Sequence, residues 1–225
     1  MNLFQLDPGS VAARARAASR PARMPSLAQS VFFGSLGFGV VSVGVFATVA
    51  FGERWMFQHL GEAGAYGAWA LLFMLATGGV LSPLVIGPDK FWRFCGLFAL
   101  AFFIYAGVWV GTYLSLHGKS GELLASVLGP ALLGMTLAKA FDAAHVVPRV
   151  AVMLSLAHAT GYFIGELLYH NFSAPLGMLL WGVSYGLGFG AGIGRALYAC
   201  QEPVRERLNG FPEPDSARSS RQNPV

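Results

Sequence analysis

The 225-residue chain has little charge, since only 12% of its residues are Asp, Glu, Lys or Arg whereas 55% are hydrophobic. Soluble globular domains carry about 25% charged residues. The mean hydropathy is +0.55, and the few charges gather near the chain ends and in short gaps between long uncharged runs. This distribution excludes an ordinary soluble domain and is typical of a membrane protein with several spans.

Cysteine is also scarce, because Cys95 and Cys200 are the only two in the chain. Two isolated thiols are too few for a disulfide framework or a cysteine metal motif. No HExxH sequence is present, so the sequence favours neither a cofactor nor an enzymatic activity. The net charge of +4 does not predict nucleic-acid binding, since the arginines flank apolar runs and do not form one basic face.

Six apolar segments remain, and each approaches the ~20 residues that a helix needs to cross a ~30 Å hydrocarbon core. They are Gln29–Phe51, Ala65–Ile86, Phe91–Leu116, Leu123–Phe141, Val150–Tyr169 and Leu176–Cys200. Because lipid cannot satisfy open backbone groups, we predict an all-α transmembrane bundle of about six spans.

The sequence predicts three regions. Residues 1–28 form a polar N-terminal segment, residues 29–200 the transmembrane domain, and residues 201–225 a polar tail that we expect to be disordered. Residues 52–64 form the longest connection, which we expect to lie along the membrane interface as a short amphipathic helix.

Lys and Arg are distributed unevenly about these six segments. Only Arg54 and Lys119, of the 15 Lys and Arg residues, fall on one side when six spans are drawn. Because cytoplasmic loops retain positive charge, we predict an inner-membrane protein with both termini in the cytoplasm and the lipid bilayer as its partner. An arginine-rich, acid-poor start also resembles an organelle transit peptide, but a cytoplasmic lead explains it more simply.

Polar residues follow one stripe of the fifth segment, where His158, Tyr162, Glu166 and His170 recur every four residues. Each step of four turns ~40° around a helix, so the four side chains fall within a ~120° arc. His158 is nine residues, or ~14 Å, beyond Arg149, which places it near the bilayer centre. Such a stripe should face other helices or water, because exposing it to lipid is costly.

Three interpretations of this stripe stay open. It forms a hydrogen-bonded cluster that joins helices, a path for protons or a solute, or part of a metal or haem site. Glu166 and His170 can share a metal, but two ligands are too few to predict one. We favour a transporter-like or channel-like protein for a small solute or proton. The alternatives are an intramembrane haem- or metal-binding redox subunit and a non-catalytic assembly protein.

Glycine recurs every four residues in the last segment, at Gly182, Gly186, Gly190 and Gly194. Gly188 and Gly192 form a second row on another face of that segment. Rows of small residues let a neighbouring helix backbone come close. We therefore predict tight packing, either against small residues of the first segment such as Gly34 or between subunits of a homo- or hetero-oligomer.

Overall fold

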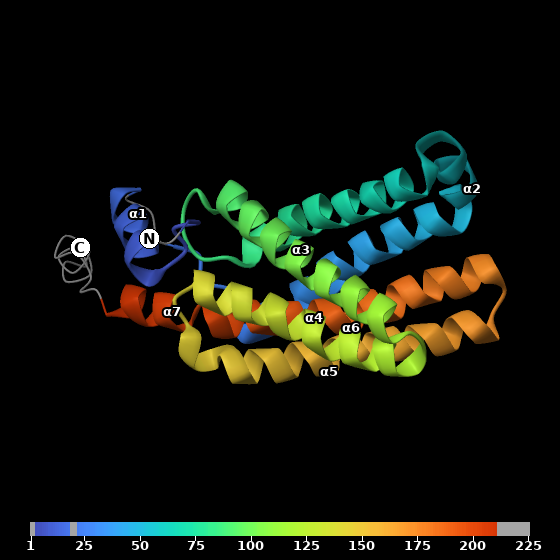
Figure 1. The fold of residues 1–225 in the computed structure, drawn as a ribbon. Coiled ribbons are helices and arrows are strands. Elements are labelled where there is room, and N and C mark those ends of the chain that lie inside the picture. Colours follow the sequence, from blue (N-terminus) through green and yellow to red (C-terminus); the bar gives the residue numbers. More distant parts are fainter. Residues whose placement is uncertain (1–2, 19–21, 211–225) are drawn as a thin grey trace, which may run out of the picture.

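The computed structural model describes residues 3–18 and 22–210, and every regular element in these ranges is a helix. The elements are α1 (Pro8–Ala17), α2 (Leu27–Leu81), η1 (Ser82–Leu84), α3 (Lys90–Leu116), α4 (Gly118–Ala140), η2 (Ala144–Val146), α5 (Val147–Asn171), α6 (Ala174–Cys200) and α7 (Glu202–Asn209). The long helices lie side by side in one elongated bundle (Figure 1). The all-α prediction is confirmed for the described residues.

Five of these helices, from α2 to α6 with their short 3-10 extensions, are long and apolar enough to cross a membrane. Large apolar side chains also cover the outside of the bundle, where Val40, Phe103, Leu156 and Leu167 are each more than 60% exposed. Water would not stabilise such a surface, whereas hydrocarbon would. These features indicate an integral membrane protein.

The first two predicted segments both lie in α2, which folds back on itself at Gly61. The backbone of Gly61 has φ 68° and ψ 173°, a conformation that is essentially restricted to glycine. The two arms of α2 then run antiparallel, so that the rings of Phe38 and Phe73 approach to 5.2 Å. Residues 52–60 continue the first arm as helix, so the prediction of a separate interfacial helix over residues 52–64 is wrong.

The glycine row of α6 lies against the first arm of α2. A Cβ at Gly186 would come 2.7 Å from Cα of Gly39, and one at Gly190 would come 2.5 Å from the carbonyl oxygen of Gly34. Gly182 faces Phe46 in the same way, and Gly194 faces Ser30. No side chain fits between these backbones, so glycine sets the distance between α2 and α6.

The second glycine row of α6 faces α5. A Cβ at Gly192 would come 2.6 Å from the Ala157 methyl group, and one at Gly188 would come 3.3 Å from Cα of Gly161. The hydroxyl of Ser184 also donates a hydrogen bond of 2.9 Å to the Gly161 carbonyl. Helix α6 therefore sits between α5 and the first arm of α2, with a glycine row turned to each.

Helices α1 and α7 pack together at one end of the bundle, which we call the α1–α7 end (Figure 1). Val11, Ile86 and Val204 form a small buried cluster there. The Gln201 side chain accepts a hydrogen bond from Ile86 N at 2.6 Å and donates one to the Leu84 carbonyl at 3.1 Å. The opposite end, which we call the hairpin end, carries the reversals at Gly61, His117 and Ser173.

The predicted disorder of residues 201–225 is wrong for residues 201–210. These residues contain α7, which buries Val204 and is joined to the bundle through the buried Gln201 side chain. Composition made the tail look unstructured, but two well-placed residues fix its first part to the bundle. Residues 211–225 lie outside the described residues.

Candidate functional site

His158 lies in the middle of α5 and is enclosed by aromatic rings. Its side chain is 1% exposed, and its ring stands perpendicular to those of Phe189 and Tyr185 at 4.9 and 5.4 Å. Gly161 permits this arrangement, because a Cβ there would come 3.0 Å from Cα of Tyr185. Close approach of α6 thus turns His158 toward other helices and away from lipid.

The hydroxyl of Tyr105 joins His158 to Tyr185. It lies 2.8 Å from Nε2 of His158 and 3.0 Å from the Tyr185 hydroxyl. Gly129 of α4 makes room for this ring, since a Cβ there would come 3.0 Å from Tyr105 Cδ2. A hydroxyl carries one proton, so Tyr105 donates to one neighbour and accepts from the other. This His–Tyr–Tyr network can therefore be polarised in either direction.

A cavity of about 220 Å³ adjoins the network, and every residue that lines it is aromatic. The lining residues, from α2, α3, α5 and α6, are Phe46, Phe73, Tyr105, Trp109, Tyr162, Trp181 and Tyr185. Those next to the network, Phe73, Tyr105 and Tyr185, are buried. Trp109, Tyr162 and Trp181 lie nearer the hairpin end and are partly exposed. The buried part of the lining is thus at the network, and its partly exposed part lies toward the hairpin end.

Two indole groups in this lining have unused donors. The Nε1 atoms of Trp109 and Trp181 are buried and have no hydrogen-bond partner among the described residues. Nδ1 of His158 is also buried and has no such partner. An indole N–H can only donate, and buried polar groups are nearly always paired. Because both indole groups line the cavity, they are candidates for binding an acceptor atom of a ligand.

Tyr162 lies between the network and the tryptophans of the cavity wall. Its ring is stacked with that of His158, at 5.9 Å and 10° between planes. It also lies 5.8 Å from the ring of Trp109 and 5.4 Å from that of Trp181. Tyr162 therefore belongs to the aromatic wall, and it separates His158 from the charged groups farther along α5.

Glu166 and His170 lie at the hairpin end in a charged cluster with Lys119 and Glu122. The Lys119 ammonium contacts the Glu166 carboxylate and pairs with Glu122 at 2.9 Å. His170 is two-thirds exposed, with Nε2 3.8 Å from Glu166. The predicted stripe is thus divided: His158 and Tyr162 join the aromatic interior, whereas Glu166 and His170 lie at its charged end.

Among the described residues, no third ligand joins Glu166 and His170, the pair that could share a metal. Within residues 3–18 and 22–210, no group of three or more His, Cys, Asp or Glu side chains is arranged so that it could hold a metal ion. The Glu166 carboxylate is also engaged by an ammonium group, which competes with a metal ion for the same oxygens. Glu166 and His170 therefore form an ion-pair cluster in this structure.

The sequence did not identify Tyr105 and Tyr185 as partners of His158, or Trp181 as a partner of Tyr162. The position of each of these residues along its predicted span can be counted from the sequence. All three fall near the middle of a span or in its outer half, away from the predicted cytoplasmic side. Which face each one turns inward depends on how the helices rotate against one another, and the glycines at positions 129, 161 and 165 set that rotation.

Comparison of the chain with protein-family models, with curated protein sequences and with solved structures gave no match.

Proposed function

We propose that this chain is an inner-membrane carrier that crosses the bilayer six times with both termini in the cytoplasm. Counting the two antiparallel arms of α2 separately gives the six crossings. In this proposal the aromatic cavity binds a small, uncharged, planar solute that carries a hydrogen-bond acceptor. The observation that carries the proposal is a cavity with wholly aromatic walls beside buried, unpaired N–H donors.

The walls define the chemistry of the solute. At about 220 Å³ the cavity is smaller than the ~300–1,000 Å³ of pockets for drug-sized ligands. Rings on all sides favour a flat molecule, because offset and edge-to-face contacts between rings are favourable. No charged side chain lines the cavity, so a solute with a full negative charge would lose its hydration without compensation.

The arrangement favours a carrier over an open channel. Between the network and the α1–α7 end, the interior is filled by Leu154, Phe189, Ile193 and Leu197, all with 0% exposure. The interior on the α1–α7 side is therefore closed, and we propose that the cavity opens toward the hairpin end. A carrier binds its solute near the bilayer middle and exposes that site to one side at a time, whereas a channel needs a continuous pore.

The two alternatives have less support. Both glycine rows of α6 are occupied by α2 and α5 of the same chain, which leaves neither row for the helix of a partner in an assembly role. A redox role through a metal would need more ligands than the pair Glu166 and His170.

Probes that differ in charge test whether the aromatic cavity binds an uncharged solute. The purified protein would be titrated with benzamide, benzoate and benzyltrimethylammonium, three small aromatic probes that differ in charge. Melting temperature and tryptophan fluorescence report binding. We expect saturable binding of benzamide, weak binding of benzoate, and about fivefold weaker benzamide binding in Trp181→Phe, which keeps the ring but loses the donor. Trp55→Phe is the control, because Trp55 is 59% exposed and does not line the cavity.

Equal binding in wild type and Trp181→Phe would contradict this use of the cavity. If the ammonium probe binds best, the solute would be an organic cation held by cation–π contacts and not a neutral molecule. Transport is tested by counterflow, in which uptake of the best-binding compound, in labelled form, into proteoliposomes is measured. If the compound binds but shows no counterflow, the protein would be a membrane receptor and not a carrier.

A further inference from the structure

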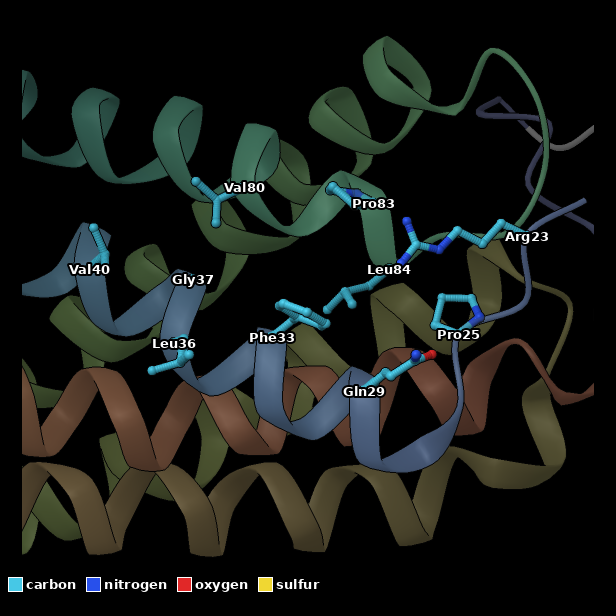
Figure 2. Close-up of a pocket in the computed structure, with 10 residues that line it drawn as sticks. All are labelled: Arg23, Pro25, Gln29, Phe33, Leu36, Gly37, Val40, Val80, Pro83 and Leu84. Carbon is cyan, nitrogen blue, oxygen red and sulfur yellow. The ribbon is translucent and has the colours of Figure 1, made fainter.

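A second cavity, of about 460 Å³, lies between the two arms of α2 near the α1–α7 end (Figure 2). Phe33, Leu36, Gly37 and Val40 of the first arm form one wall. Val80 of the second arm, with Pro83 and Leu84 of η1, forms the other. We call this space the α2 groove. Val40 is 72% and Val80 44% exposed, so the groove is open to the lipid-facing surface.

The mouth of the α2 groove is basic. Arg23 reaches back over it toward Pro83, and Gln29 lies on the other side (Figure 2). No carboxylate within the described ranges is within ion-pair distance of Arg23. The Lys90 ammonium donates a hydrogen bond of 3.1 Å to the Pro83 carbonyl, so a second positive charge is fixed beside the mouth.

The length of the groove matches one leaflet of a bilayer. Its first wall runs from Gln29 to Val40, eleven residues or ~17 Å along a helix. Half of a ~30 Å hydrocarbon core is ~15 Å. With Arg23 at headgroup level, an acyl chain lying along this wall would end near the bilayer middle, beside Val40 and Val80.

We propose that the α2 groove is a binding site for an anionic phospholipid of the cytoplasmic leaflet, with its phosphate at Arg23 and one acyl chain between the arms of α2. The charge of the mouth, the apolar walls and the leaflet-length groove all fit this one ligand. A pocket lined by Arg149, Arg195 and Arg205 also holds Glu202 and Glu206, which offset its positive charge. The site depends on the membrane placement proposed above and is independent of what the aromatic cavity binds.

Lipid binding to the delipidated full-length protein tests this site. Phosphatidylglycerol and phosphatidylcholine with identical acyl chains would be titrated in a mild detergent, and bound lipids counted by native mass spectrometry. We expect one phosphatidylglycerol per chain to bind about fivefold or more tightly than phosphatidylcholine, since one basic residue near the headgroups contributes about this factor. Arg23→Gln should lower that preference about fivefold, because one basic residue is lost and Lys90 remains, whereas Arg207→Gln, which replaces an exposed arginine of α7, should leave it unchanged.

A second pair of variants tests the walls. Val40→Trp fills the end of the groove and should weaken binding of both lipids, whereas Val110→Trp, at an exposed valine of α3 outside the groove, should not. Both pairs replace exposed side chains, so folding should be preserved, and helical circular dichroism checks this. Equal affinity for the two lipids in wild type, equal loss in Arg23→Gln and Arg207→Gln, or full binding by Val40→Trp would each overturn the proposal.

Discussion

The hydroxyl of Tyr105 links α3, α5 and α6 through polar contacts in the interior. It bonds to His158 and Tyr185, and all three side chains are less than 10% exposed. In a membrane the hydrophobic effect does not drive helices together, so packing and hydrogen bonds of this kind contribute to their association. The network therefore has a structural role in addition to any role in binding.

His158 and Glu166 should differ in their effect on stability, although both lie on one stripe of α5. His158→Ala empties space within a packed cluster of rings and removes the partner of the Tyr105 hydroxyl. We expect a loss of about 2 kcal/mol or more in the free energy of unfolding. Glu166→Gln weakens an ion pair with an exposed lysine, and pairs of this kind contribute little.

Thermal melting in detergent measures this difference. Glu166→Gln should melt close to wild type and His158→Ala well below it. Comparing benzamide binding or counterflow at a temperature where both variants are folded then separates function from stability. Similar melting of the two variants would show that the division of the stripe is wrong.

At the scale of elements, the hairpin of α2 depends on the backbone of one residue. Gly61→Ala should destabilise the protein by about 1–3 kcal/mol, because its φ and ψ are unfavourable for any residue with a Cβ. The effect would come from strain alone, since a Cβ at Gly61 would have no atom within 4 Å.

Gly67→Ala is the matched control for this hairpin, because Gly67 lies in the helical second arm and also has open space around its Cβ position. It should stabilise slightly, by about 0.5–1 kcal/mol, as alanine does within a helix. Melting temperatures that shift in the same direction for both variants would rule out the strained turn.

The contact between α6 and α2 makes a different prediction, because there a Cβ collides with backbone. Gly190→Ala should separate the helices and lower the melting temperature in detergent, since the Gly34 carbonyl cannot move away as a side chain would. Gly107→Ala in α3, where a Cβ has no neighbour within 4 Å, should melt at or slightly above wild type. Equal melting of the two would refute close packing as the role of the row.

At the scale of the whole molecule, the positive charges differ between the two ends of the bundle. Arg14, Arg149, Arg195 and Arg205 lie toward the α1–α7 end, whereas Lys119 lies in the first turn of α4, at the hairpin end. Because Lys and Arg remain in the cytoplasm, a reporter enzyme that works only outside the cytoplasm should be active when fused at Lys119. It should be silent when fused after Asn209. Reporter activity at both fusion sites would contradict the six-span arrangement.

Much of this fold could be predicted from the sequence, because hydrocarbon permits few solutions. A run of about 20 apolar residues must form a helix when it spans lipid. The boundaries of the last predicted segment, Leu176–Cys200, accordingly differ by two residues at one end from those of α6. The helices α1 and α7 escaped prediction because they lie outside that constraint and are held by a few specific contacts.

The sequence by itself determined that this chain forms apolar helices of membrane-spanning length, that polar groups lie on one stripe of α5, and that glycines allow close packing along α6. Only the tertiary structure decided which groups meet. The rotation of each helix about its axis decides whether Tyr105 and Tyr185 reach His158, and contacts between distant residues such as Gly129 and Tyr105 or Gly161 and Tyr185 set that rotation. The spacing of residues along one helix does not contain this information, because it fixes a face of the helix but not the neighbour that the face contacts.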